Sequence, residues 1–333
     1  MIVGANEARF EAAGHWGKLP DAWTYADVVG VAVDAADRVY VLNRGQSPMS
    51  PDHPVIVFER DGTFVRSFGD GLFTFAHGIS LDAAGNVYCV DSGDHTVRKF
   101  SPDGKLLLTL GACGEPSDTG YTTDYRTITP GGPPFNMPTN LAIGPSGDLY
   151  VSDGYGNSRI HHFSADGTLL HSWGEPGTGP GQFNIVHAVR ALDDGRLLVC
   201  DRENSRVQVF REDGVFLDEW TDLLRPDDLW VDPSGQVYIA ELGERAGLFP
   251  FMDQPYGHNR PGRVSVRDLD GGKITSWGGD DPYAPESFFA PHGIAGDSAG
   301  DLYVSEVLNA AGGNAGLIRL EEAHALQKFI RVR

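Results

Sequence analysis

One unit recurs six times along this chain of 333 residues, a period of about 55 residues, and the recurrence constrains the fold more than any other feature. Each unit has an apolar run, a turn of the Asp-x-x-Gly type and then a short motif of the Val-Tyr-Val type. The six copies of the motif are Val39–Val41, Val87–Cys89, Leu149–Val151, Leu197–Val199, Val237–Ile239 and Leu302–Val304. A repeat of this length predicts a propeller or solenoid rather than two unrelated domains.

The residues within each unit predict short antiparallel strands. Apolar and polar residues alternate with a period of two between turns rich in Gly, Asp, Asn and Pro. Several units add a third strand, an Asp-Gly hairpin and a fourth strand that ends in Leu-Gly or Trp-Gly. Four such strands form one propeller blade. We therefore predict an all-β, six-bladed β-propeller with four antiparallel strands per blade, as a single domain over residues 1–333.

Two segments outside the regular repeat carry their own predictions. Residues 10–16 resemble the end of a blade, and we expect them to pair with the last blade and so close the ring. Residues 320–328 have a helix-like composition and are the only helix that we predict.

Composition excludes several kinds of partner. The formal net charge of −20 disfavours nucleic acid and anionic lipid, which select basic surfaces. No window of about 18 apolar residues predicts a membrane span. The three cysteines are odd in number and widely spaced, and the N-terminus lacks the features of a signal peptide. We expect reduced thiols and a cytoplasmic protein, while the oligomeric state stays unknown.

Three histidines occupy one equivalent place in alternate blades. They are His77, His187 and His292, and each lies where the inner strand of its blade begins. Inner strands surround the central channel, so imidazoles from alternate blades can meet around the axis. Three neutral histidines with an open fourth position are typical of catalytic zinc. We predict a site for zinc or another divalent transition metal, and we interpret the other histidines as ordinary polar residues.

Two arginines and a tyrosine are expected on the same rim. Arg44 and Arg202 follow the second strands of their blades, and Tyr155 follows that of the third blade. A guanidinium suits a carboxylate, and positive charge beside a tyrosine favours the phenolate, which can act as a base. The alternative is that the arginines pair with the acids that end the second strands. Those acids are Asp91, Asp153, Asp201, Glu241 and Glu306.

Long insertions enter at this rim. They cover residues 112–137, 242–262 and 306–315, and loops of such length are often functional. We expect them to wall the mouth of the site, with Tyr256 and His258 as candidate contacts.

Several segments resemble one enzyme family. They are Asn43–Gly45, Ala76–Gly78, Val151–Ile160, Cys200–Gln208 and Pro291–Gly293. From about residue 25 to 310 the chain resembles peptidyl-α-hydroxyglycine α-amidating lyase, and the rest of the pattern is that of generic NHL repeats. The segments around Tyr155 and Arg202 are the most specific.

The resemblance implies a reaction and a set of roles. His77, His187 and His292 match the zinc ligands, Tyr155 the catalytic tyrosine, and Arg44 and Arg202 the active-site arginines. The implied reaction cleaves the C–N bond of an α-hydroxyglycine, a carbinolamide, to give an amide and glyoxylate. The implied substrate is a small or peptide-derived molecule with a carboxylate.

The chain departs from the family at three positions. Ala290 replaces a methionine, Gly293 replaces an aspartate that helps to bind a structural calcium, and Gly156 replaces a cysteine of a disulfide. No monooxygenase domain that would make the hydroxyglycine is present in the sequence. The chemistry can therefore be kept while the substrate differs. Two alternatives remain open: another metal-dependent hydrolysis, hydration or lactone opening, and a non-catalytic NHL interaction propeller.

Overall fold

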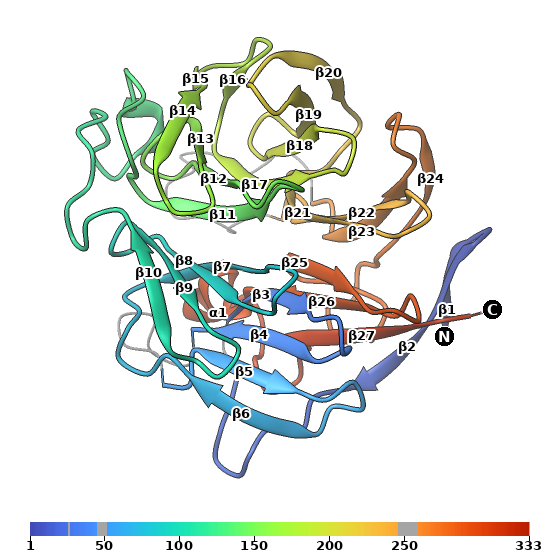
Figure 1. The fold of residues 1–333 in the computed structure, drawn as a ribbon. Coiled ribbons are helices and arrows are strands. Elements are labelled where there is room, and N and C mark those ends of the chain that lie inside the picture. The colour runs from blue at the N-terminus through green and yellow to red at the C-terminus, as the bar shows by residue number, and fades with distance from the viewer. Residues whose placement is uncertain (26, 45–51, 246–258, 333) are drawn as a thin grey trace. The chain divides into compact units, whose positions relative to one another are not determined.

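A computed structural model describes residues 1–25, 27–44, 52–245 and 259–332. The chain divides into two compact units. One is built from the described residues of 1–68 and 227–333, and the other from residues 69–226. Each unit consists almost entirely of antiparallel sheets (Figure 1). The single-domain organisation stays a prediction.

The unit of residues 69–226 contains three four-stranded sheets. Their strand orders are β10-β9-β8-β7, β11-β12-β13-β14 and β17-β18-β19-β20. A short parallel pair, β15 (Glu175–Pro176) and β16 (Gln182–Phe183), precedes the third sheet. The strands of the sheets are β7 (Ala76–Leu81), β8 (Val87–Asp91), β9 (Thr96–Phe100), β10 (Leu106–Leu110), β11 (Pro138–Ile143), β12 (Leu149–Asp153), β13 (Arg159–Phe163), β14 (Leu169–Trp173), β17 (Val186–Ala191), β18 (Arg196–Asp201), β19 (Arg206–Arg211) and β20 (Phe216–Trp220).

The other unit contains the remaining three sheets. Their strand orders are β3-β4-β5-β6, β21-β22-β23-β24 and β1-β2-β27-β26-β25. The strands are β1 (Ile2–Ala5), β2 (Ala8–His15), β3 (Val28–Val33), β4 (Val39–Asn43), β5 (Val55–Phe58), β6 (Phe64–Phe68), β21 (Pro226–Val231), β22 (Val237–Glu241), β23 (Arg263–Arg267), β24 (Lys273–Trp277), β25 (Pro291–Gly296), β26 (Leu302–Glu306) and β27 (Leu326–Arg331).

These sheets confirm the predicted fold class, a six-bladed β-propeller with four antiparallel strands per blade. Every Val-Tyr-Val-type motif lies in the second strand of a blade, and these strands are almost entirely buried. Burial on both faces explains their apolar composition. The aromatic and aliphatic side chains that they contribute, such as Tyr150 and Val199, lie in the hydrophobic core beside Phe183 and Phe210.

The N-terminal strand completes the last blade, as predicted. Strand β2 pairs antiparallel with β27, with Phe10 opposite Arg331. Because β27 also pairs with β26, the chain's first and last strands share one sheet. Strand β1 then covers the outer edge of β2, with Ile2 opposite Glu11.

The predicted helix over residues 320–328 is wrong. A turn occupies residues 320–322, and the strand β27 begins at Leu326. The strand supplies the third position of its blade, between β26 and β2, so pairing on both sides outweighs the local helical composition. The helical elements are instead short: α1 (Leu308–Ala311), η1 (Tyr125–Thr127) and η2 (Gly313–Ala315).

An irregularity recurs near the start of the inner strands. The strand register shifts between Ala76 and Gly78, and again between Pro291 and Gly293. The same shift occurs in β3, β11 and β17, between Val28 and Gly30, Pro138 and Asn140, and Val186 and Ala188. Each of the three aligned histidines is therefore the second residue of its strand, not the first as predicted, and lies at a β-bulge. A β-bulge changes the direction in which a side chain points, so the bulge sets the direction of each histidine side chain.

Candidate active site

The acids that end the second strands fix the segments that lead into the inner strands. Asp91 accepts hydrogen bonds from the backbone N–H of Phe75 at 2.8 Å, and Glu306 does so from Ala290 at 2.9 Å. Asp201 accepts one from Asn184 at 2.8 Å. Each bonded amide lies two or three residues before the histidine position of the same blade. The acids therefore anchor the backbone that carries His77, His187 and His292.

The imidazoles of His77 and His292 are held in the same way. Nδ1 of His77 lies 2.7 Å from the carbonyl oxygen of Thr139, and Nδ1 of His292 lies 2.8 Å from that of Val29. A carbonyl oxygen only accepts, so each Nδ1 carries the proton and Nε2 keeps its lone pair in the neutral ring. Histidines that bind metals are usually fixed through their other nitrogen in this manner.

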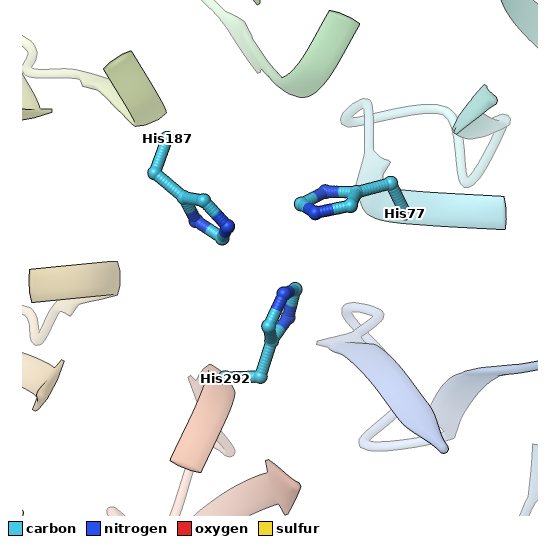
Figure 2. Close-up of side chains that lie close together, drawn as sticks. All are labelled: His77, His187 and His292. Carbon is cyan, nitrogen blue, oxygen red and sulfur yellow. The ribbon is translucent and has the colours of Figure 1, made fainter. Parts of the chain in front are cut away.

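His77, His187 and His292 are each buried, and their imidazoles are drawn in Figure 2. His77 and His187 belong to the unit of residues 69–226, and His292 belongs to the other unit. The ring centroids of His77 and His187 lie 4.8 Å apart at an interplanar angle of 66°. The donor set, neutral imidazole nitrogens on rigid strands, fits zinc and similar divalent transition metals.

Tyr155 lies against both histidines of its unit. Its hydroxyl oxygen is 3.1 Å from Nε2 of His77 and 3.2 Å from Nε2 of His187. The hydroxyl has a single proton and can donate to only one of these nitrogens at a time. The predicted neighbourhood of the tyrosine and these two histidines is therefore present within one unit.

Arg202 is the third group at the tyrosine hydroxyl. Its Nη1 lies 3.2 Å from the oxygen of Tyr155, and its guanidinium lies over the tyrosine ring, 5.4 Å from the centroid. Only 1% of Arg202 is exposed. A buried guanidinium in this position donates a hydrogen bond to the phenol oxygen.

The charge of Arg202 is balanced locally. Glu203 lies 2.9 Å from Nε of Arg202, and it also accepts from Nη2 of Arg225 at 2.6 Å. Burial alone would raise the pKa of Glu203, but Arg225 and Arg202 lower it to about 2. Two guanidiniums thus contact one carboxylate.

Arg44 follows β4 in the other unit and is 3% exposed. Its Nη1 lies 3.5 Å from the carboxylate of Asp27, and its backbone N–H donates to the carbonyl of Asp27 at 2.9 Å. The same carboxylate accepts from the backbone of Asn309 and Ala310, which lie in the 306–315 insertion. Arg44 thus contacts Asp27, as Arg202 contacts Glu203.

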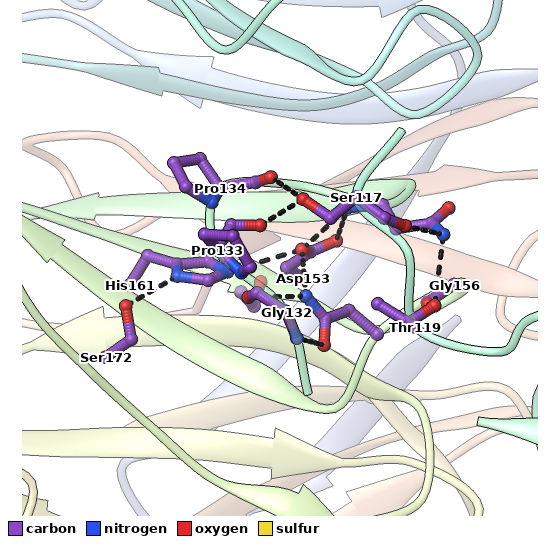
Figure 3. Close-up of polar contacts among 12 residues, drawn as sticks. Ser117, Thr119, Gly132, Pro133, Pro134, Asp153, Gly156, His161 and Ser172 are labelled. Atoms are coloured by element: carbon purple, nitrogen blue, oxygen red, sulfur yellow. Dashed lines mark hydrogen bonds and ion pairs between the residues drawn. The ribbon is translucent and has the colours of Figure 1, made fainter. Parts of the chain in front are cut away.

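A buried polar network holds the loop that carries Tyr155 (Figure 3). The hydroxyl of Thr119 donates to the carbonyl of Gly156, and the backbone N–H of Gly156 donates to the carbonyl of Asn136 at 3.0 Å. The side-chain amide of Asn136 reaches the hydroxyl of Thr119 at 3.1 Å. The carboxylate of Asp153 accepts from the backbone N–H of Asn136 at 2.8 Å. Residues 112–137 therefore fix the residue next to the tyrosine.

Sequence reasoning did not single out Thr119 or Asn136. Their only sequence signal is the glycine at position 156, where the resembling family has a cysteine. A Cβ atom at Gly156 would lie 2.2 Å from Oδ1 of Asn136, so the asparagine fills the space that a side chain there would need. In this chain hydrogen bonds tether the loop in the place where the resemblance implies a disulfide.

Gly293 likewise fits its surroundings only as glycine. A Cβ atom there would lie 2.7 Å from the hydroxyl oxygen of Ser305 and 2.9 Å from Cα of Gly30. The aspartate that the resemblance places at this position, as a helper of calcium, would have to displace backbone.

The insertion over residues 112–137 comes close to Tyr155 and Arg202. The hydroxyls of Tyr121 and Tyr125 are partly buried, and burial raises the pKa of both. Tyr121 lies within electrostatic range of Tyr155, and Tyr125 within range of Glu203 and Arg202. The candidate contacts Tyr256 and His258 in the second insertion lie outside the described residues.

Comparisons with known proteins agree with this fold. The NHL repeat family matches residues 135–163 and 183–210. NHL repeat-containing protein 3 from Mus musculus is 34% identical over 255 residues, which cover 73% of this chain and 69% of that protein. The chain therefore belongs to the family of NHL repeat-containing proteins.

Other relatives are amidating enzymes. Peptidyl-alpha-hydroxyglycine alpha-amidating lyase 1 from Drosophila melanogaster is 34% identical over 199 residues, or 53% of this chain and 34% of that protein. Peptidylglycine alpha-amidating monooxygenase from Rattus norvegicus is 29% identical over 310 residues, covering 84% of this chain but only 29% of the longer protein. Within its family the chain is thus an amidating-lyase-like NHL propeller, which confirms the resemblance.

Among solved structures, a gluconolactonase from Xanthomonas campestris superposes with a TM-score of 0.57. The two share 16% identity over 92% of this chain and 87% of the other, so this likeness shows the fold alone. In the described part of the chain, no helix has the length and apolar character needed to cross a membrane.

Proposed function

We propose that this chain is a metal-dependent lyase that cleaves the C–N bond of an N-acyl-α-hydroxyglycine. In this reaction the hydroxyl O–H and the C–N bond break, while the carbon forms a C=O bond and the nitrogen gains a proton. The products are an amide and glyoxylate, and no further reactant is needed. The relatives named as amidating lyases support the reaction class.

The observation that carries this proposal is the position of the Tyr155 hydroxyl. It lies 3.1 and 3.2 Å from Nε2 of His77 and His187, and 3.2 Å from the guanidinium of Arg202. A general base must lie within hydrogen-bonding distance of the proton that it removes, beside the group that positions the substrate. Tyr155 is an ionisable group that contacts both histidines and the arginine of its unit.

Tyr155 takes the proton of the substrate hydroxyl and returns it to the nitrogen as the C–N bond breaks. Arg202 positions the hydroxyl oxygen of the tyrosine, because its guanidinium donates a hydrogen bond to that oxygen. Arg44, buried beside Asp27, holds the substrate carboxylate or stabilises the charge that develops as the C–N bond breaks.

His77, His187 and His292 hold the metal, zinc or another divalent transition ion. Their burial and the Nδ1 hydrogen bonds of His77 and His292 support this assignment. When bound, the metal supplies Lewis-acid polarisation of the substrate oxygens. The other ring nitrogen of each fixed histidine stays bonded to a backbone carbonyl, so the imidazoles cannot rotate away.

The test is product analysis on metal-loaded protein. N-acetyl-α-hydroxyglycine is incubated with the protein, and acetamide and glyoxylate are quantified beside a protein-free reaction, which measures spontaneous breakdown. Equal amounts of both products, formed faster than in the protein-free control, support the lyase. If only water addition or opening of an added lactone is accelerated, the reaction is hydrolytic and the lyase proposal fails.

A further inference from the structure

A small cavity lies in the unit of residues 69–226, between the 112–137 insertion and the loop before β17. Its volume is about 250 Å³. Its floor consists of Ile128, Phe183 and Ile185, of which at most 5% is exposed. Tyr125 and Pro176 are further apolar lining residues. The polar lining residues are Arg126, Ser158, Thr178 and Asn184.

The cavity wall and the candidate active site are joined by backbone hydrogen bonds. The N–H of Arg202 donates to the carbonyl of Ile185 at 3.1 Å, and the N–H of Glu203 donates to the carbonyl of Asn184 at 3.0 Å. Ile185 also lies two residues before His187. The cavity therefore adjoins the backbone that positions both the arginine and one histidine.

The backbone of the cavity wall at Ile185 has an unusual conformation. Ile185 has a φ of 56°, in the left-handed region that a β-branched residue rarely adopts. Met137 and Arg225, which immediately precede β11 and β21, have φ values of 61° and 58°, so this conformation recurs where inner strands begin. Tyr125, another lining residue, lies within electrostatic range of Arg202 and Glu203.

We propose that this cavity binds the acyl substituent of the substrate, and that the preferred substituent is a compact apolar group, aromatic or branched. This inference rests on the proposed function, because it assumes that the glycine half lies at Tyr155 and Arg202. It adds the chemical class of the other half of the substrate.

Size and polarity select that class. A cavity of about 150 Å³ accepts a benzene ring, so 250 Å³ has room for one phenyl or leucine-sized group but not for a second residue. The floor carries no ionisable side chain, and burying a charge there without a partner is costly. The charged group among the lining residues, Arg126, is already bonded to Asp124. The rest of a longer substrate would therefore extend out of the cavity past its polar lining residues. Only the substituent next to the glycine half would be selected by the cavity.

The experiment uses unreactive analogues so that binding is separated from turnover. N-benzoylglycine and N-acetylglycine lack the α-hydroxyl and differ only in the acyl group. Their dissociation constants are measured by calorimetry on the metal-loaded protein. We expect N-benzoylglycine to bind at least about tenfold more tightly, because the phenyl group is buried and the methyl group leaves the cavity unfilled.

Two variants test whether this preference arises in the cavity. Thr178→Trp places a large side chain at the exposed rim of the cavity, and Ile128→Ala removes part of its floor. Both should reduce the preference to about threefold or less while N-acetylglycine binds as in the wild type. Thr168→Trp, at an exposed threonine of the hairpin between β13 and β14, is the matched control and should keep the full preference. Thermal unfolding verifies that each variant is folded.

Equal affinity for the two analogues in the wild type overturns the proposal, as does a preference that survives Thr178→Trp and Ile128→Ala. Absence of binding by both analogues also overturns it. If N-benzoylglycine binds with the expected preference but N-benzoyl-α-hydroxyglycine is not cleaved, the cavity assignment stands and the lyase function fails.

Discussion

The guanidinium of Arg202 donates to the hydroxyl of Tyr155 at 3.2 Å while its Nε bonds Glu203 at 2.9 Å. One planar side chain thus connects the candidate base to a buried carboxylate whose pKa is lowered to about 2. A lysine could reach one of these partners but has no fork with which to hold both.

Arg202→Lys should therefore lower kcat/KM for an α-hydroxyglycine by about 10². Lysine keeps the positive charge, so a loss of this size would arise from the missing two-pronged geometry of the guanidinium and not from a change of charge. Steady-state kinetics on the metal-loaded protein measure it. Arg211→Lys, at an exposed arginine paired with Asp213, is the control and should leave kcat/KM unchanged. If Arg202→Lys lowers kcat/KM by less than about twofold, the role assigned to Arg202 is contradicted.

Tyr155→Phe should reduce kcat by about 10²–10⁴ because it removes the only group assigned to proton transfer. Bound metal, measured by elemental analysis, should stay at the wild-type amount, since the tyrosine is not one of the proposed ligands. Tyr150→Phe, at a buried tyrosine of β12, is the matched control. Full activity of the Tyr155 variant would exclude the tyrosine as the base.

His187→Ala should abolish metal binding after extensive dialysis, while the wild type retains about one divalent ion per chain. Removal of one of three protein ligands leaves a site with too few donors for zinc. His171→Ala, at an exposed histidine of β14, should bind metal as the wild type does. An unchanged metal content in the His187 variant would show that the ion lies elsewhere.

Thr119→Val should lower kcat by about tenfold without changing the metal content, because the carbonyl of Gly156 loses its side-chain donor and Tyr155 loses its exact placement. The unfolding free energy should fall by about 1–3 kcal/mol, the cost of an unsatisfied buried group. Thr119→Ser keeps the hydroxyl and should restore kcat. Thr122→Val, at an exposed threonine of the same insertion, is the control. A drop in stability with wild-type kcat would reduce the network to a structural role.

Glu306 gives the protein a defined pH dependence. Burial raises the pKa of this carboxyl to about 7, against an ordinary value of 4.5. A raised native pKa means that the stabilising contribution is complete below about pH 4.5 and is lost as the pH rises through 7. Up to about 3 kcal/mol of unfolding free energy should disappear over this window in the wild type but not in Glu306→Gln. Urea unfolding at pH 5.5, 7 and 8 measures both slopes, and parallel slopes would contradict the expectation.

Local patterns in the sequence predicted most of the fold. The alternation of apolar and polar residues and the Asp-Gly turns located all six second strands, because a buried strand imposes its period of two directly on the residues. The same repeat located His77, His187 and His292 at one place in alternate blades. The repeat placed Tyr155 and Arg202 on the same rim, the resemblance implied their roles in the reaction, and the structure brings these two side chains together with His77 and His187.

The sequence by itself therefore determined the blades, their strand order and the positions of the candidate ligands. Only the tertiary structure decided that the ligand positions are β-bulges, that residues 326–331 form a strand, and that Thr119 and Asn136 hold the loop of Tyr155. These features depend on pairing and hydrogen bonding between segments far apart in the chain. Such contacts produce no periodic pattern in the sequence, because they depend on which segments lie opposite each other in space and not on the neighbouring residues in the chain.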